Sequence, residues 1–551
     1  MTETFSGLAN GRPQFASREL VSLAETNGNL AAWRQLIEQE GVAAIRQVSG
    51  EFAVGFDDGK GRVYLAVDHF AIRTLCYRID GGNLRFAERA DELADTSTGI
   101  DPEAIYDYFH FHVIPSPRTI FQGVHRLPPG HYAVFEKGTI TVKPYWVPEF
   151  SEPSNANFND LKDQFRQLLQ DSVLRELDGG KQGCFLSGGT DSSTVAGMIA
   201  RASGRRASSY SIGFEAEGYD EMAYARIAAR HFDTYHHEYY VTPSDLVRSI
   251  PDVARYYDQP FGNSSVLPAY YCAKMAREDG VTRILAGDGG DELFGGNARY
   301  AKQRLFDAYR HIPGVLRSGL VEPLSMAPGI RQIPLVRKMG SYVEQARLPM
   351  PDRLELYNLI TRLDPAVVLT PEFLGQVDLQ APLRLQHEVW NAAQTRNPLN
   401  RGLAFDWRFT LAESDLPKVR GSTQLAGIEV GFPMLDQAIV DFSCKLPVDY
   451  KLKGLKLRWF FKAALKDFLP DEIIRKKKQG FGLPFGVWLL RDEALMKLAK
   501  DSVNGLAERG IMSKAFVRNL FADYVPSHPG YFGEMVWIAM MLEQWMRGRG
   551  R

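Results

Sequence analysis

Hydrophobic and polar positions follow two different patterns along the chain, with a change near residue 150. Between residues 46 and 90, apolar and polar side chains alternate in four short runs: EFAVGFDD, RVYLAVDH, LCYRID and LRFAER. A period of two predicts antiparallel strands, and Asp- and Gly-rich turns separate them. A helix is predicted over 101–111, with Asp101 as its N-cap and Pro102 in its first turn.

From about residue 158, helices alternate with short apolar strands. The predicted helices are 159–176, 194–201, 220–232, 244–257 and 267–278, and the predicted strands are 183–186, 208–214, 236–241 and 282–286. Such alternation predicts a parallel sheet whose ligands bind at the carboxyl ends of the strands. Residues 148–158 are the linker candidate, and the Met and Trp side chains of an apolar helix at 532–545 are expected in the core.

The first strand of this second region leads into the loop SGGTDSS, residues 187–193. A strand–loop–helix unit brings free backbone N–H groups and a helix N-terminus together, which suits an anion. Its two glycines allow close approach, and its serines add hydroxyl donors. Asp191 would repel bare phosphate but can hold Mg²⁺ that bridges phosphates. No Gly-Lys-Ser/Thr follows, so this is not a Walker P-loop, and a plain Ser/Gly-rich turn is the structural alternative.

A second Gly-rich loop, GDGGDELFGG at 287–296, follows the fourth predicted strand. Because Asp191 and Asp291 follow different strands of one parallel sheet, they can converge on Mg²⁺ that neutralises a triphosphate. A turn with solvated acids is the alternative for this loop alone. His236 and His237 are adjacent on a predicted strand, so they point to opposite faces and are not expected to share a metal.

Composition narrows the class of protein. The chain has 551 residues, enough for two or more domains with hydrophobic cores. Its net charge of −1 gives no electrostatic reason to expect nucleic acid or an anionic membrane as a partner. Four widely spaced cysteines without a CxxC pair argue against a zinc site or a disulfide framework. Without a signal-peptide pattern or an apolar run that spans a bilayer, we expect a cytoplasmic protein.

Several stretches of the first region resemble the asparagine synthetase family. The second half of that family's glutaminase domain contains, in the same order, segments similar to EFAVGFDD, VDHFAIRTLCY, FAE, IPSPRTIFQGV, RLPPGH and KPYW of this chain. That domain is a β-sandwich of the N-terminal nucleophile (Ntn) hydrolase type and normally starts Met-Cys-Gly, whose Cys attacks glutamine. This chain starts Met1-Thr2-Glu3, has no Cys before Cys76, and lacks the family's glutamine-holding signatures. We therefore expect a truncated, degenerate domain over 1–150 that serves as a scaffold, with Thr2 as the alternative nucleophile.

The second region, 158–551, resembles the synthetase domain of the same family, and SGGTDSS its pyrophosphate (PP) loop. The resemblance implies an α/β two-domain protein with an adenine-nucleotide α-hydrolase-like parallel sheet, and it implies ATP and Mg²⁺. It assigns the phosphates to Ser187, Gly188, Gly189, Ser192 and Ser193, the adenosine to Leu186, Ile212 and Gly287, and Mg²⁺ to Asp191 and Asp291.

Further segments of the same resemblance carry basic and acidic candidates. Lys456, in KGLK, is implied to meet pyrophosphate. Lys478, in KKKQGFGLP, is implied to stabilise adenylation or aminolysis, although a solvated basic run is the alternative. Asp288 and Glu429 are candidates to orient the amine or accept its proton.

The chain departs from the family where the acid substrate would bind. Gln259 and Asn263 are amides where the family carries acids, Arg420-Gly421 replaces an Asp-Arg pair, and Gly431 replaces an Arg. These changes put aspartate in doubt as the substrate, because a site with unpaired charges rejects a ligand strongly. Relatives that close β-lactams or lasso peptides keep this scaffold without the Cys nucleophile.

Three functions are compatible with these observations. The leading hypothesis is an ATP-dependent amide ligase that activates a small-molecule or peptide carboxylate as an acyl-adenylate, releasing pyrophosphate and AMP, without its own glutaminase activity. The nitrogen of the new amide bond would come from an amine or ammonia. The biosynthesis of specialised metabolites is one setting in which such a ligase would act. The alternatives are an asparagine synthetase fed by ammonia or externally supplied glutamine nitrogen, and a non-catalytic scaffold. A homodimer is a further state of the protein that the sequence leaves open.

Overall fold

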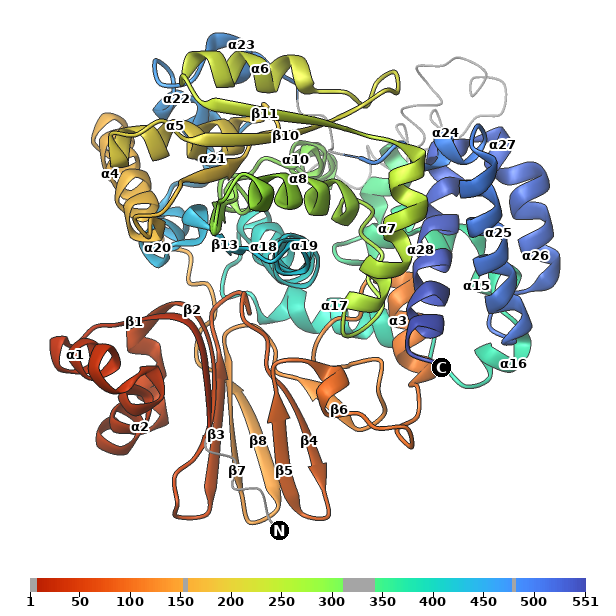
Figure 1. Ribbon diagram of the computed structural model, residues 1–551, viewed down its shortest axis with the longest axis horizontal. Helices are drawn as coiled ribbons and strands as arrows, with labels where there is room; N and C mark the ends of the chain where they lie inside the picture. Colours follow the sequence, from red (N-terminus) through yellow and green to blue (C-terminus); the bar gives the residue numbers. More distant parts are fainter. Residues whose placement is uncertain (1–6, 152–156, 311–341, 478–481) are drawn as a thin grey trace.

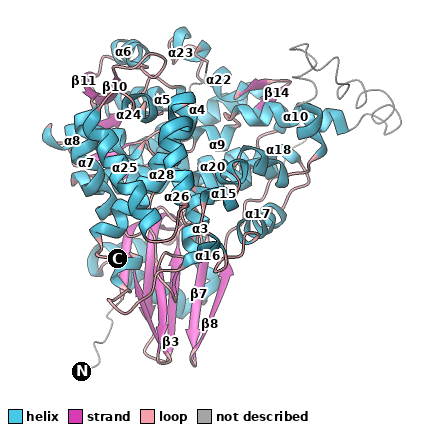
Figure 2. Ribbon diagram, turned by 90° about the vertical axis from the view of Figure 1, so that its right-hand side faces the viewer, coloured by secondary structure: helices cyan, strands magenta, loops and turns pink. Residues whose placement is uncertain are grey.

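The structure is a computed structural model that describes residues 7–151, 157–310, 342–477 and 482–551 (Figure 1). It contains an N-terminal domain of antiparallel sheets and a C-terminal domain of helices around a parallel sheet. Figure 2 shows the strands of the first domain below the helices of the second. The two-domain α/β architecture expected from the sequence is confirmed. Lys478 lies outside the described residues, as does Thr2.

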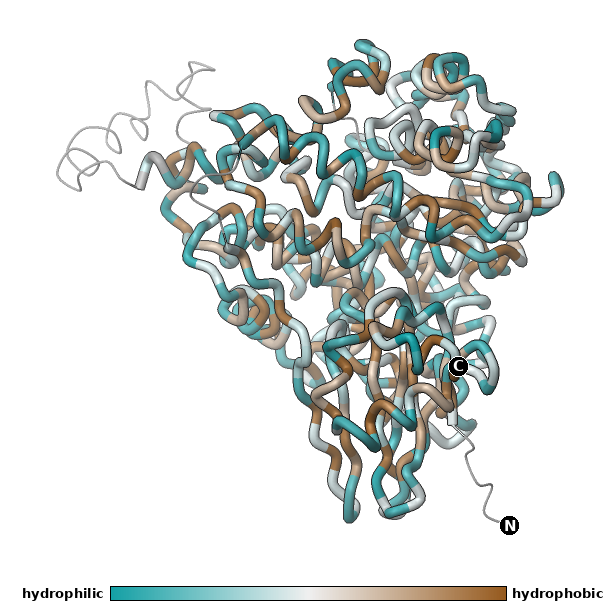
Figure 3. The backbone as a smooth tube through the Cα atoms, turned by 90° about the vertical axis from the view of Figure 1, so that its left-hand side faces the viewer, coloured by the Kyte–Doolittle hydropathy of each residue, from teal (hydrophilic) through white to brown (hydrophobic). Residues whose placement is uncertain are grey.

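Two antiparallel sheets form the N-terminal sandwich, in the orders β1-β2-β3-β7-β8 and β5-β4-β6. Their strands are β1 (Leu8–Phe15), β2 (Val48–Asp57), β3 (Arg62–Val67), β4 (Cys76–Asp80), β5 (Asn83–Ala87), β6 (Val124–Arg126), β7 (His131–Glu136) and β8 (Thr139–Pro144). One core fills the space between the sheets, with Leu65, Tyr77, Phe86 and Phe135 among its members. Teal and brown positions are mixed along these strands in Figure 3, as alternation requires. The four strands predicted between residues 46 and 90 are confirmed.

Residues before 46 form elements that no sequence pattern predicted. Helices α1 (Arg18–Asn27) and α2 (Asn29–Glu40) cover the outer face of the larger sheet, followed by a 3₁₀ turn, η1 (Val42–Gln47). Trp33 fixes them there, because its ring lies 5.4 Å from the ring of Phe15 and 4.9 Å from that of Phe52. The predicted helix near 101 is confirmed as α3 (Pro102–Phe111), and the carboxylate of Asp101 accepts a hydrogen bond from the N–H of Glu103.

The C-terminal sheet is parallel throughout, in the order β11-β10-β9-β12-β13. Its strands are β9 (Gly183–Phe185), β10 (Ser208–Phe214), β11 (Tyr235–Val241), β12 (Arg283–Leu285) and β13 (Glu429–Gly431). Four of them were predicted, and β13 was not. On β11, His236 hydrogen-bonds to Ser209 while His237 lies beside Asp279, so the two side chains have different partners, as expected for adjacent residues of a strand.

Helices cover both faces of this sheet (Figure 1). They are α4 (Phe158–Glu176), α5 (Thr190–Ser203) and α6 (Met222–His231) on one face, and α7 (Pro243–Tyr256), α8 (Val266–Glu278) and α19 (Leu416–Ala426) toward the other. Apart from α19, these were predicted, although α5 begins four residues earlier than expected, inside the SGGTDSS loop. The predicted apolar helix is α28 (Pro529–Gly548), whose Met and Trp side chains are buried as expected.

The remaining described elements complete the C-terminal domain. Before η5 they are α9 (Gly290–Phe294), α10 (Ala298–Arg310), η4 (Asp352–Tyr357), α14 (Leu359–Leu363), α15 (Pro365–Val368), α16 (Pro371–Leu374), α17 (Ala381–Ala392) and α18 (Pro398–Asp406). From η5 onward they are the π-helix η5 (Trp407–Asp415), η6 (Pro433–Leu435), α20 (Gln437–Lys445), α21 (Val448–Lys451), β14 (Leu452–Lys453), β15 (Lys456–Leu457), α22 (Trp459–Ala464), α23 (Asp471–Arg475), α24 (Phe485–Leu489), α25 (Glu493–Glu508), α26 (Lys514–Asn519), η7 (Leu520–Tyr524) and α27 (Val525–Ser527). Within the described ranges, no helix is long and apolar enough to cross a membrane.

Aromatic side chains join the two domains. The ring of Trp146, at the end of the first domain, stacks on Trp407 of η5 at 6.2 Å and on His69 at 4.6 Å. His69 also hydrogen-bonds to Gln437 of α20, and burial lowers its pKa to about 4.

The four cysteines of the chain are interior groups: each is a buried, free thiol.

Candidate functional site

The SGGTDSS loop forms a tight turn between β9 and α5. The hydroxyl of Ser192 accepts a hydrogen bond from the N–H of Ser187 at 3.2 Å, and the two hydroxyls lie 3.0 Å apart. The hydroxyl of Ser187 accepts from the N–H of Gly189, which is the N-cap of α5. Gly188 has a φ of +67°, and a Cβ there would clash with the backbone of Tyr224 and Ala225. The predicted phosphate residues Ser187, Gly188, Gly189 and Ser192 are thus brought together at a helix N-terminus.

Ser193 differs from its neighbours in the loop. Its side chain is 0% exposed, and its hydroxyl has no hydrogen-bond partner among the described residues. It lies in the first turn of α5, behind the residues that line the loop. A contact with phosphate is therefore better expected from its neighbours than from its hydroxyl.

The residues predicted to hold adenosine lie at the ends of three adjacent strands. Leu186 follows β9 and donates its N–H to the carbonyl oxygen of Tyr210 at 2.9 Å, next to Ile212 on β10. Gly287 follows β12, and a Cβ there would lie 2.8 Å from the nitrogen of Ser192 and 3.1 Å from the Cβ of Asp191. The structure therefore brings Leu186, Ile212 and Gly287 to the carboxyl edge of the sheet, as predicted.

The two aspartates predicted to bind Mg²⁺ converge on one side chain that the sequence did not single out. Arg458 donates from Nη1 to Asp191 Oδ2 at 2.7 Å, to Asp291 Oδ1 at 2.8 Å and to Thr190 Oγ1 at 2.8 Å. Its guanidinium also lies 3.9 Å from the centre of the Phe461 ring, and its side chain is 6% exposed. We call Asp191, Asp291 and Arg458 the Arg458 cluster. Two loops thus place two carboxylates around one cation position.

This donor set fits a magnesium ion. Mg²⁺ in nucleotide sites usually takes one or two protein carboxylates and completes its shell with phosphate and water oxygens. Asp191 and Asp291 can supply those two carboxylates, since oxygens of both lie within 2.8 Å of one nitrogen. The described part of the chain contains no group of three or more His, Cys, Asp or Glu that could hold a metal alone. Arg458 lies two residues after Lys456. The one feature of the sequence that could have pointed to it is that this arginine stands among apolar residues.

A second cluster lies beside the first, at Asp288. The ammonium of Lys418 lies 3.6 Å from Asp288 Oδ1 and 2.9 Å from Asp415 Oδ1. Burial raises the pKa of Asp288, an effect that Lys418 partly offsets and Asp415 reinforces. Burial disfavours the charged form of Lys418, but the carboxylates of Asp415 and Asp288 outweigh this and raise its pKa. We call Asp288, Asp415 and Lys418 the Lys418 cluster. A carboxylate with a raised pKa suits a proton acceptor.

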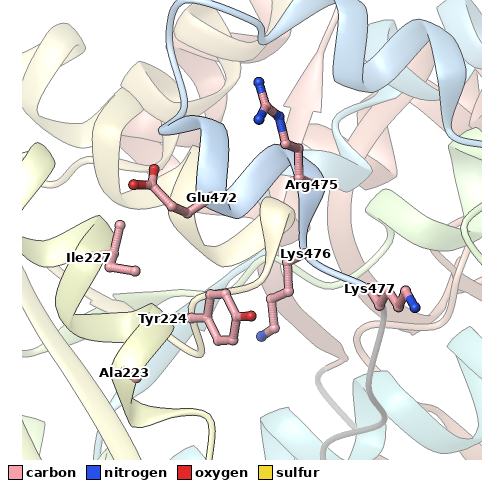
Figure 4. A pocket seen from close by; sticks show the side chains of 7 residues that line it. All are labelled: Ala223, Tyr224, Ile227, Glu472, Arg475, Lys476 and Lys477. Atoms are coloured by element: carbon pink, nitrogen blue, oxygen red, sulfur yellow. The ribbon is translucent and has the colours of Figure 1, made fainter.

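The predicted basic residues have different positions. Lys456 is exposed on the β14–β15 hairpin, on the segment that leads to Arg458. Lys478 itself is not described, but Lys476 is: its Nζ lies 2.8 Å from Glu221 Oε1, 3.4 Å from the Gly188 oxygen and 4.6 Å from the Tyr224 ring centre. Figure 4 shows Lys476 and Tyr224 facing a pocket between α6 and α23. Lys476, which precedes the predicted Lys478, thus reaches the edge of the SGGTDSS loop.

Glu429 is the predicted site residue that the structure does not bring to the others. It begins β13 and is paired in register with Arg283, the first residue of β12, so it lies at the amino edge of the sheet. Its carboxylate binds Arg73 of the N-terminal domain at 2.7 Å and is 52% exposed. The prediction that Glu429 acts on the amine is corrected, because the loops that carry the site follow the opposite ends of the strands.

The positions that depart from the family face the N-terminal domain or pack in the interior. Gln259 accepts a hydrogen bond from the N–H of Ile120 at 3.3 Å, and Arg420 donates to the Ile72 oxygen at 2.6 Å. Asn263 donates to Ser414 Oγ at 3.2 Å. A Cβ on Gly421 would clash with the Tyr257 ring. The residues that differ from the family therefore lack the charges that the family carries in the region expected to bind the acid substrate. They connect this region to the domain interface.

Comparisons with known proteins agree with this geometry. A family model described as asparagine synthase matches residues 164–547, and one described as a glutamine amidotransferase domain matches residues 25–146. The chain is similar to "Asparagine synthetase [glutamine-hydrolyzing] 1" of Bacillus subtilis (strain 168), 24% identical over 95% of this chain and 80% of that protein.

Two further relatives are also similar to this chain over most of its length. "Putative asparagine synthetase [glutamine-hydrolyzing]" of Mycobacterium bovis is 26% identical over 83% of this chain and 70% of its own length. "Amidase chyE" of Penicillium rubens is 22% identical over 88% of this chain and 78% of its own length. Because the first family model spans well over half of the chain, the protein belongs to the asparagine synthase family.

Proposed function

We propose that the protein is an ATP-dependent ligase that activates a carboxylate as an acyl-adenylate and joins it to an amine nitrogen. The family supports an ATP-dependent, amide-forming ligase. The observation that carries the proposal is the convergence of Asp191 and Asp291, from loops after two adjacent strands, on one cation position beside a helix N-terminus. This arrangement suits the binding of a nucleotide triphosphate, and a non-catalytic scaffold would not need it.

The chemistry follows from the weakness of a carboxylate as an acyl donor. Its oxygen attacks the α-phosphorus of ATP, the bond to the β-phosphate breaks, and pyrophosphate leaves. An amine then attacks the acyl carbon, loses a proton and expels AMP. Positioning and electrostatic stabilisation are the protein's main contributions to both steps.

Residue roles follow from position. Ser187, Gly188, Gly189 and Ser192 hold the phosphates, and Leu186, Ile212 and Gly287 border the adenosine. Asp191 and Asp291 would hold Mg²⁺, which when bound neutralises charge on the polyphosphate. Asp288 would accept the proton of the attacking amine, a role supported by its pKa, which burial raises. Lys456 and Lys478 keep the roles that the family implies, contact with pyrophosphate and stabilisation of the reacting complex.

We further propose that the N-terminal domain supplies no ammonia from glutamine. Cys76 is fully buried within its sandwich, and burial raises the pKa of its thiol to about 12, so it cannot act as a nucleophile near neutral pH. The nitrogen then comes from a free amine or from ammonia, and specialised metabolism is one setting for such a reaction.

A second candidate is asparagine formation from aspartate, with ammonia or externally supplied glutamine nitrogen. The names of the two bacterial relatives described above favour it. Against it stand Gln259 and Arg420, whose side chains are turned to the N-terminal domain in place of the charged groups that the family offers to aspartate.

The first experiment measures pyrophosphate and AMP release from Mg-ATP with a panel of carboxylates, including L-aspartate, amino-acid derivatives and peptide acids. Ammonium, glutamine and hydroxylamine are supplied in parallel as nitrogen sources, and hydroxylamine traps an acyl-adenylate as a hydroxamate. We expect carboxylate-dependent AMP release, and asparagine as the product would select the second candidate.

One substitution tests the site itself. Asp191→Asn is expected to abolish AMP release, whereas the matched control Asp171→Asn, on the exposed side of α4, is expected to retain it. Full activity of Asp191→Asn would contradict the assignment.

A further inference from the structure

We infer that the N-terminal domain positions the substrate side of the active site, and that the Ser116–Glu413 contact is the central link. This inference rests on the proposed ligase function, because the site concerned is the same. It assigns the degenerate domain a task in catalysis that requires no chemistry of its own.

The link is the buried carboxylate of Glu413, which accepts hydrogen bonds from both domains. Ser116 donates to Glu413 Oε1 from its N–H at 3.1 Å and from its hydroxyl at 2.7 Å. Arg408 pairs with the same carboxylate and donates to the Ser116 oxygen at 2.5 Å. Both Ser116 and Glu413 are buried, so the carboxylate depends on these donors in place of water.

The segment that carries Glu413 also reaches the active site. Glu413 lies in the π-helix η5, two residues before Asp415, which holds Lys418 at 2.9 Å in the Lys418 cluster. At the other end of η5, Trp407 donates its indole N–H at 2.9 Å to the Glu292 backbone oxygen, next to Asp291 in α9. π-Helical backbone is rare and frequently occurs at functional sites. A shift of η5 would therefore act on the 287–296 segment at two points, Asp288 through Lys418 and Glu292 through Trp407.

The N-terminal domain contacts η5 at both ends. Trp146 stacks on Trp407 with an interplanar angle of 6°, and Ser116 binds Glu413. The same segment thus lies between the first domain on one side and the 287–296 segment on the other. Displacements of about 1 Å in such supports can reduce turnover by about 10²-fold, because reacting groups must be held in near-attack geometry.

A second connection runs through the loop at 258–263. Asp258 accepts hydrogen bonds from the Ala90 N–H at 2.9 Å and from Arg126 at 2.7 Å. Gly262 donates its N–H to the His112 oxygen at 2.8 Å, and Asn263 then donates to Ser414 of η5. The loop is therefore fastened to the first domain along its length and to η5 at its end.

The opposite edge of the sheet offers a matched control. There Arg73 of the N-terminal domain binds Glu429 at 2.7 Å and Glu51 at 3.3 Å. This contact also joins the two domains through charged groups, but Glu429 lies at the amino edge of the sheet, at the opposite ends of the strands from the loops that carry the site. Loss of either link should lower stability, whereas loss of the Ser116–Glu413 link alone should alter the kinetics.

The experiment compares Glu413→Gln and Ser116→Ala with the control Arg73→Met, using the carboxylate found in the screen above. We expect the first two to raise KM for the carboxylate or lower kcat by about tenfold or more, while KM for Mg-ATP changes less than about twofold. Ser116→Thr, which keeps the hydroxyl, should restore most of the activity. Equal kinetic losses in Arg73→Met, or an equal loss of ATP affinity, would overturn the inference.

Hydrogen exchange separates this inference from the proposed function. In Ser116→Ala we expect faster amide exchange at 407–418 and 258–263, with residues 183–203 unchanged, whether or not a carboxylate has been identified. Faster exchange without AMP release from the wild type would retain the positioning link and reject the ligase. Unchanged exchange and unchanged kinetics in Ser116→Ala would reject the link, even if Glu413→Gln fails to fold.

Discussion

The parallel sheet carries charged side chains at both of its edges, and the two groups differ in how their charges balance. At the amino edge, Arg283 pairs with Glu176 and Glu51, and Arg73 pairs with Glu51 and Glu429. Arg12 also lies 3.9 Å from Glu176, so three arginines face three glutamates. Arginines and glutamates alternate here, so the group links the two domains without needing any further ion. At the carboxyl edge, the Arg458 and Lys418 clusters contain more carboxylates than cations. An excess of negative charge at the ends of strands suits a metal and an amine, whereas a balanced group suits a structural link.

The largest expected effect separates the two edges by activity. Asp291→Asn should lower kcat/KM for AMP release by about 10³-fold, because the charge of the transferring phosphates loses one of its fixed partners. Glu429→Gln removes a carboxylate of the opposite edge and should change kcat/KM by less than about twofold. Pyrophosphate release measured on both variants checks this. Comparable losses in the two variants would mean that both edges serve the reaction.

A smaller effect concerns the stability of the carboxyl edge. Arg458→Met removes the cation that Asp191 and Asp291 share, and breaking a buried ion pair of this kind costs about 3 kcal/mol in the free energy of unfolding. Millimolar Mn²⁺ or Mg²⁺ should recover part of this loss, since a ligand that binds the folded state stabilises it. Thermal unfolding with and without the metal provides the measurement. Identical curves in both conditions would argue that the two carboxylates do not form a metal site.

The smallest expected effect is a pH dependence at the domain interface, where His69 stacks on Trp146. Burial lowers the pKa of His69 to about 4, from an ordinary value of 6.5. The folded protein then binds fewer protons than the unfolded chain, so stability is present above about pH 6.5 and is lost as the pH falls toward 4. The loss is at most about 3 kcal/mol. Denaturant unfolding of wild type and His69→Gln between pH 4 and 7 tests this. A wild-type curve as flat as the variant's would refute it.

Much of the fold could be predicted because its signals are local. Alternation identified the four strands between residues 46 and 90, and the change to helical spacing identified the second domain. Strand β13 has only three residues and follows a helix closely, so no periodicity can reveal it. Strand β1 contains Gly11 and Pro13 and lies at a sheet edge, where alternation is weak.

The candidate site was predictable in part for the same reason. Ser187 to Asp191 and Gly287 to Asp291 are contiguous motifs, and the rule for parallel sheets places them together. Arg458 was missed because its partners are remote in the chain, and nothing near it in sequence indicates burial between two aspartates. Glu429 was misplaced because a motif gives a position in sequence but not the end of the strand on which it lies.

The buried thiols have a practical consequence for spectroscopy. Burial raises the pKa values of Cys76, Cys184 and Cys444 to about 12 and that of Cys272 well above its ordinary range. Maleimide reagents attack thiolates, so the native protein should remain almost unlabelled under mild conditions. Cysteines introduced on the surface of each domain would then carry the dye or spin label alone. Distances across the interface could be followed during turnover in a chain that keeps all of its natural cysteines.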